Sequence, residues 1–73
     1  MKIFGRTENN ENLMMMQEIA FQSTPEELRQ ISEFLLISAE KMEKHGKDFG
    51  HDHYKKFLKI NLNSEGPDII VSA

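Results

Sequence analysis

Thr24–Leu28, with the sequence TPEEL, begins the segment that decides the fold, a predicted helix that runs to about Gly46. The Thr24 hydroxyl is suited to an N-cap, where it accepts a hydrogen bond from a free N–H of the first turn. Pro25 stands at the first helical position, where its missing N–H costs nothing, and Glu27 can reach back to the Thr24 N–H to complete a capping box. Basic side chains in the last turn suit the negative end of the helix dipole, and Gly46 is a typical left-handed C-cap.

The apolar residues of this helix recur at steps of three and four, which predicts one stripe facing the core. The stripe consists of Leu28, Ile31, Leu35, Ala39 and Met42. Phe34 flanks it, whereas at about 100° per residue Ile37 points nearly opposite its centre and Leu36 lies well to one side. Two interpretations of Leu36 and Ile37 stay open: tolerated surface residues, or a second contact surface.

Length and composition describe a single small domain spanning residues 1–73, without cysteine and therefore without disulfides or thiol chemistry. The net charge is −3, from nine basic and twelve acidic residues, and this disfavours nucleic-acid or anionic-membrane binding, which needs clustered Lys and Arg. We find neither a signal-peptide type of apolar run nor a segment of membrane-spanning length. A cytoplasmic, soluble protein is expected.

The rest of the chain predicts strands separated by turn-forming residues. The expected strands are Met1–Thr7, Leu13–Phe21, Lys55–Asn63 and Ile69–Val71. Lys47–Tyr54 is expected to be a connecting segment. The predicted fold is therefore α+β with the order β-β-α-β-β, in which one long helix covers one face of a small, mainly antiparallel, four-stranded sheet.

The other face of that sheet is expected to be partly apolar, with Met14 or Met16 among its residues. A small sheet with such an open face is often completed by a partner, frequently a second copy of the same chain. We therefore predict a homodimer, with Met14 and Met16 on the sheet and Leu36 and Ile37 on the outer helix surface as candidate partner-binding residues. The sheet face is the favoured interface.

Chemically capable side chains gather only between residues 45 and 53, where His45, Asp48, His51 and His53 are candidate ligands for a divalent transition metal such as zinc. His51 and His53 are two residues apart, so an extended backbone points both imidazoles to one side. The alternative is that His45 caps the helix and the other histidines bond backbone groups. Because no serine has an elbow motif and no phosphate loop exists, we predict no enzyme and no required cofactor.

Four short segments together resemble a family of small bacterial immunity proteins of polymorphic-toxin systems, over most of the chain from about Glu18 onward. They are Ser23–Leu28, Glu33–Leu36, Gly50–His53 and Pro67–Val71. The resemblance implies a non-catalytic protein that binds and neutralises a cognate toxin. It also draws attention to the histidine segment and to the Pro67-Asp68 pair, without saying what they do.

The preferred hypothesis is thus a protein-binding module of immunity type with a toxin as its partner. One alternative is a small metal-binding or metal-responsive protein that uses His45, His51 and His53. Another is a structural homodimer. A toxin-like open reading frame beside the gene would favour the first hypothesis, and metal content after tag-free purification would favour the second.

Overall fold

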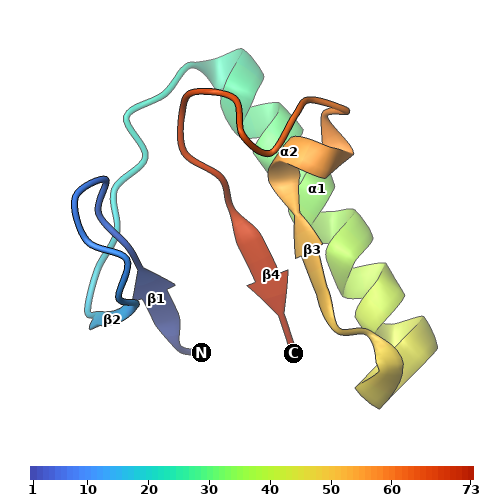
Figure 1. Ribbon diagram of the computed structural model, residues 1–73. Coiled ribbons are helices and arrows are strands. Elements are labelled where there is room, and N and C mark those ends of the chain that lie inside the picture. Colours follow the sequence, from blue (N-terminus) through green and yellow to red (C-terminus); the bar gives the residue numbers. More distant parts are fainter.

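The computed structural model describes all 73 residues as one long helix with two separate two-stranded sheets (Figure 1). The elements in chain order are β1 (Ile3–Gly5), β2 (Met14–Met16), α1 (Pro25–His45), the 3₁₀ turn η1 (Gly46–Asp48), β3 (His51–His53), α2 (Tyr54–Phe57) and β4 (Ile70–Ser72). The α+β class and the order β-β-α-β-β are confirmed, with one short helix added between the last two strands. Neither helix has the combination of length and apolar character that crossing a membrane requires.

The ends of α1 lie where the sequence places them. The Glu27 N–H donates to the Thr24 hydroxyl oxygen at 3.2 Å, which confirms Thr24 as the N-cap. The capping box is only half formed, because the Glu27 carboxylate accepts from the Ser23 hydroxyl rather than from the Thr24 N–H. At the other end Gly46 has φ 54° and donates its N–H to the Met42 carbonyl, so glycine is required there for its backbone conformation.

The strands form two hairpin-like pairs rather than the predicted single sheet. β1 pairs antiparallel with β2, with Ile3 opposite Met16, and β3 pairs antiparallel with β4, with His53 opposite Ile70. The expected four-stranded sheet is therefore wrong, and the first two strands are shorter than predicted, at three residues each. β3 and β4 lie along α1, while the β1–β2 hairpin stands away from them (Figure 1).

The third strand lies earlier in the chain than predicted. It is His51–His53, inside the segment expected to be a connection, and part of the predicted strand Lys55–Asn63 belongs to α2. The sequence is ambiguous here, because Tyr54, Phe57 and Leu58 follow helical spacing as well as Leu58, Ile60 and Leu62 follow strand spacing. The helical spacing prevails because it places Phe57 and Leu58 against the core.

The core lies between α1, α2 and the β3–β4 pair. Its buried apolar side chains are Ile31, Phe34 and Tyr54. The ring of Phe34 packs at 5.4 Å from that of Tyr54 and 5.6 Å from that of Phe57. Three aromatic rings in mutual contact account for most of the packing in this small domain.

The buried face of α1 is rotated relative to the predicted stripe. Ile31 is buried and Met42 half-buried, as predicted, but Leu28 and Leu35 remain 43% and 45% exposed and Ala39 is exposed. Phe34, expected on the flank, is the centre of the buried face, and Ile37, expected to point outward, is half-buried. The rotation follows from Phe34, because an aromatic ring that meets two other rings buries more surface than a leucine does.

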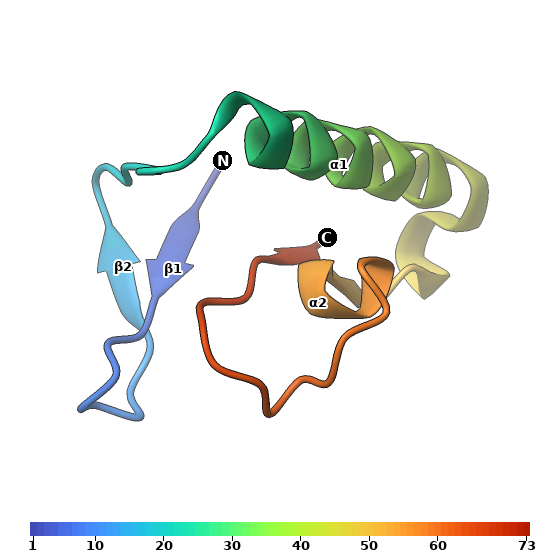
Figure 2. The same cartoon turned by 90° about the horizontal axis from the view of Figure 1, so that it is seen from above.

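Residues 1–23 form a segment that we call the N-terminal arm. None of its residues is buried, and only Ile3 and Gly5 are half-buried. Gln17–Thr24 runs without regular structure from β2 to the start of α1, and the hairpin stands apart from α2 and β4 in the second view (Figure 2). We call residues 25–73 the body, since all of the core belongs to them.

Candidate functional site

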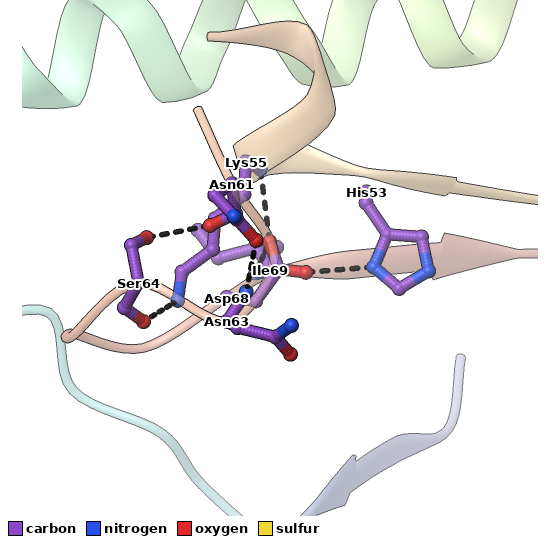
Figure 3. Close-up of polar contacts among 7 residues, drawn as sticks. All are labelled: His53, Lys55, Asn61, Asn63, Ser64, Asp68 and Ile69. Atoms are coloured by element: carbon purple, nitrogen blue, oxygen red, sulfur yellow. Dashed lines mark hydrogen bonds and ion pairs between the residues drawn. The ribbon is translucent and has the colours of Figure 1, made fainter. Parts of the chain in front are cut away.

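The carboxylate of Asp68 joins the histidine segment Gly50–His53 to its own segment, Pro67–Val71 (Figure 3). Its Oδ2 atom lies 2.7 Å from Nδ1 of His53, and its Oδ1 atom accepts the backbone N–H groups of Lys55 and Ile69, each at 2.9 Å. The N–H of Tyr54 donates to the Ile69 carbonyl at 2.8 Å. We call these contacts of Asp68 the Asp68 clip, because they hold the approach to β4 against the start of α2.

The clip controls the ionisation of Asp68. Burial alone would raise the pKa of this carboxyl, but hydrogen bonds from His53 and from the N–H groups of Lys55 and Ile69 outweigh it, so the pKa lies below its ordinary value. An ionised Asp68 can only accept, and the bond therefore fixes the proton of His53 on Nδ1. In the neutral imidazole this tautomer leaves the lone pair on Nε2.

The loop after α2 is tied to the same place. Lys55 is 5% exposed, and its Nζ donates to the Ser64 carbonyl at 2.7 Å. The Ser64 hydroxyl in turn donates to the Asn61 carbonyl at 2.6 Å (Figure 3). The buried stem of Lys55 thus packs in the body while its ammonium group closes the loop, a division of roles common for lysine.

On the other side of β3, Asp52 faces α1. Its Oδ2 atom accepts from the Ser38 hydroxyl at 3.2 Å and lies 3.5 Å from Nζ of Lys41. Ser38 is 1% exposed, so this contact explains a polar residue at the centre of the buried helix face. Two aspartates therefore hold β3 in place. Asp52, which belongs to β3, bonds to α1, and Asp68, which precedes β4, bonds to His53 at the end of β3.

A cleft of about 390 Å³ lies beside these contacts. It is lined by Phe34, Ile37, Lys41, His51, Asp52, His53, Lys56 and Phe57. The rings of His51 and His53 meet edge to face with centroids 5.1 Å apart, which confirms that the extended backbone brings the two imidazoles together. The body therefore presents the two imidazole rings side by side at this cleft.

The four predicted metal ligands are not assembled. His51 and His53 are neighbours, but no three His, Asp or Glu side chains of the chain come close enough to hold a metal ion together. His45 ends α1 and Asp48 belongs to η1, both before the turn that leads into β3. A carboxylate bonded to the far nitrogen of a histidine is nevertheless a common support for a metal ligand, and the Asp68–His53 pair has that form.

Sequence reasoning places Asp52 among the chemically capable residues of this segment, but it does not predict its contacts with Ser38 and Lys41, and it gives Asp68 no role. The contact between Asp68 and His53 joins residues 15 positions apart, and that between Ser38 and Asp52 joins residues 14 apart. No local sequence pattern predicts contacts between residues so far apart. The only sequence feature that pointed to His53 and Asp68 is that each lies in a segment resembling the immunity family, Gly50–His53 and Pro67–Val71.

The predicted partner-binding residues divide in the structure. Leu36 is 62% exposed on α1, and Met14 and Met16 are exposed on β2, whereas Ile37 is half-buried and lines the cleft. Leu28 and Leu35 join Leu36 as large exposed residues of the helix. We call Leu28, Leu35 and Leu36 the α1 flank: Leu28 and Leu35 border the buried face of the helix, and Leu36 lies beyond them on its exposed side.

Comparison with known proteins adds no assignment: the chain matches no family model, no curated protein and no solved structure.

Proposed function

We propose that the chain is a non-catalytic protein-binding module. The observation that carries this proposal is the exposure of fourteen large hydrophobic side chains on a domain whose buried apolar core contains three. Scattered exposed apolar residues are ordinary, but contiguous apolar surface on a small soluble domain marks an interaction site. The Asp68 clip fits the same proposal, because its contacts position the backbone of β3, α2 and the approach to β4.

The α1 flank is the surface we assign to the partner. Its three leucines stand at positions i, i+7 and i+8 of the helix. The pair at i and i+7 is part of the spacing with which a helix inserts into an apolar groove of another protein, and Leu36 adjoins it toward the exposed side. Burying each of these side chains is worth roughly 1.5–3 kcal/mol. Leu36 is the central residue, because it is the most exposed of the three.

The partner we propose is a bacterial toxin domain that the chain neutralises by binding. The support is the resemblance of Ser23–Leu28, Glu33–Leu36, Gly50–His53 and Pro67–Val71 to immunity proteins of polymorphic-toxin systems. Glu33–Leu36 contributes two residues of the α1 flank, Leu35 and Leu36. The other segments supply the helix start and the Asp68 clip, so they preserve the fold that presents this flank.

The experiment co-expresses the chain with the toxin domain encoded beside its gene and measures growth. We expect protection by the natural chain and loss of protection by Leu36→Glu. The control is Gln30→Glu, which adds the same charge at another exposed position of α1 and should protect fully. Absence of protection by the natural chain would overturn the toxin as partner, and full protection by Leu36→Glu would overturn the α1 flank as the surface.

A second candidate function is metal binding through the histidines, favoured by one observation. Asp68 holds Nδ1 of His53, so the Nε2 atom of the neutral imidazole could bind a metal, and the ring of His51 lies beside it. Two imidazoles give weak affinity, so we propose at most an accessory zinc site.

A further inference from the structure

A second pocket, of about 510 Å³, lies between the end of the N-terminal arm and the body. One wall is formed by residues 20–23, and the others come from the first turns of α1, from α2 with the loop after it, and from the chain that precedes β4. Its large apolar side chains are Phe21, Ile31, Leu58, Ile60 and Ile69. Pockets of this volume with mainly apolar walls are the usual binding sites of small molecules.

Tyr54 brings an unpaired polar group to this pocket. Its side chain is 6% exposed, and its hydroxyl is the one buried side-chain polar atom of the chain that has no hydrogen-bond partner. Burial raises the pKa of this hydroxyl, and the negative charge of Glu27 raises it further. The hydroxyl end of the ring therefore lies toward Glu27, which lines the pocket together with Tyr54. The rings that pack on Tyr54, those of Phe34 and Phe57, line the histidine cleft instead.

A buried hydroxyl without a partner destabilises the fold, and nearly all buried polar groups in proteins have one. A ligand that supplies the partner removes this loss, so the hydroxyl favours occupation of the pocket by a molecule with a polar group at this point.

The charges of the lining favour a cation. Three carboxylates, those of Glu27, Glu65 and Asp68, stand against the single ammonium group of Lys55. Lys55 and Asp68 are already bonded to other groups of the body. The carboxylate of Glu27 accepts a side-chain hydrogen bond at Oε1 only, so its Oε2 atom is available to a ligand close to the hydroxyl of Tyr54.

The wall formed by residues 20–23 gives access to the covered hydroxyl. These residues are exposed, belong to no helix or strand and make no backbone hydrogen bond. Moving them to admit a ligand therefore breaks no backbone pairing.

We propose that this pocket binds a small molecule that has an apolar body and a protonated amine. The apolar body packs against the apolar walls, while the ammonium group donates hydrogen bonds to the carboxylate of Glu27 and to the hydroxyl oxygen of Tyr54. No residue of the α1 flank lines the pocket, so this binding is separate from that of the toxin.

Titration of the natural chain with phenethylamine at neutral pH, followed by the amide shifts in NMR spectra, tests this proposal. We expect saturable binding with shifts concentrated in the residues that line the pocket. The anion 3-phenylpropionate has a similar apolar body and the opposite charge, and it should bind at least about tenfold more weakly because the uncommitted charges of the lining are negative.

Two variants and a control assign the contacts. Tyr54→Phe should weaken the binding of phenethylamine about fivefold and Glu27→Gln about tenfold, since a hydrogen bond to a charged group is the stronger one. The amide of Glu27→Gln can still accept from Ser23, so the helix start is kept. Glu26→Gln removes the same charge from an exposed neighbour that does not line the pocket, and it should bind phenethylamine as the natural chain does.

The proposal fails if phenethylamine shows no saturable binding, if the anion binds equally well, or if Tyr54→Phe leaves the affinity unchanged. Denaturation without ligand gives a separate test. Tyr54→Phe should unfold at a denaturant concentration no lower than that of the natural chain, because its hydroxyl has no partner to lose. A lower midpoint would show that the hydroxyl is bonded within the chain and is not available to a ligand, which would also overturn the proposal.

Discussion

The arm and the body of this chain are built from similar residues but held by different means. The arm is rich in hydrophobic side chains, yet none is buried, and its backbone pairing is limited to one short hairpin. The body buries Ile31, Phe34 and Tyr54 together and adds polar contacts between residues far apart in sequence. Hydrophobic content alone therefore does not fold a segment, because apolar residues stabilise only where another surface removes them from water.

The difference also separates two kinds of apolar surface. The side chains of the core are excluded from solvent by their own chain, whereas the large apolar side chains of the arm and of the α1 flank remain exposed. Mutations can test this division directly.

The largest effect is expected at the centre of the core. Phe34 is 2% exposed, and Phe34→Ala should cost about 3–5 kcal/mol of unfolding free energy. The adjacent Leu35→Ala removes a side chain that is 45% exposed and should cost well under half of that in the monomer. Urea denaturation at low concentration measures both. Equal losses of unfolding free energy would show that Leu35 is buried as deeply as Phe34. The distinction between the core and the α1 flank would then be wrong.

The Asp68 clip should give the next largest effect. Asp68→Asn replaces the carboxylate that holds His53, and losing a hydrogen bond to a charged group costs about 1.5–3 kcal/mol. Asn can still accept the Lys55 N–H. The control Asp48→Asn removes the same charge from an exposed residue of η1 and should be close to neutral. If the denaturation midpoint shifts equally in both variants, the effect comes from the change in net charge and not from the clip.

The clip also makes stability depend on pH in a definite direction. The native pKa of Asp68 is lowered from the ordinary value of 3.8, so the native state favours the ionised form. This contribution is fully present above the ordinary pKa and is lost as pH falls through 3.8 toward the native pKa. Denaturation midpoints at pH 6 and below should decline more steeply for the natural chain than for Asp68→Asn. Parallel curves would show that other carboxylates carry the acid sensitivity.

A smaller effect is expected at the junction between arm and body. Thr24→Ala removes the hydroxyl that accepts the Glu27 N–H and should cost about 0.5–2 kcal/mol. Thr24→Ser keeps an oxygen at this position and should restore most of the loss. Thermal unfolding followed by circular dichroism measures both. An unchanged midpoint for Thr24→Ala would mean that Ser23 and Glu27 hold the helix start without it.

The smallest expected effect is metal binding. Calorimetric titration of the untagged chain with zinc should show weak heat of binding that disappears in the double variant His51→Ala, His53→Ala. Asp68→Asn should weaken this binding, since it releases the proton from its fixed place on Nδ1. Equal heat from the double variant would leave the two histidines a structural role alone.

The features that could be predicted from the sequence are those that depend on near neighbours. Thr24, Pro25 and Gly46 define the ends of α1 within a few residues of chain, and the structure confirms both ends. Strands at the positions of β1 and β2 are also predicted, because turn-forming residues separate the two apolar runs. The fold class followed from the order of these elements.

The rest depends on residues that meet only after folding. Leucines at regular spacing predicted the wrong face of α1, because Phe34 finds its ring partners Tyr54 and Phe57 more than 15 residues later. β3 was missed for the same reason, since its pairing with β4 and its contact with Asp68 are both long-range. The paired histidines were anticipated, but the aspartates that hold their strand were not.

The burial of Tyr54 also affects the absorption and fluorescence of the chain. It is the only tyrosine of a chain that has no tryptophan, and it is buried between Phe34 and Phe57. Burial, and after it the negative charge of Glu27, raise the pKa of its hydroxyl above the ordinary value of 10.0, so tyrosinate absorption should rise at a higher pH in the folded chain than in the unfolded one. Tyrosine fluorescence therefore reports on the packing around Tyr54, where α2 meets α1, and the natural chain carries this probe without any label.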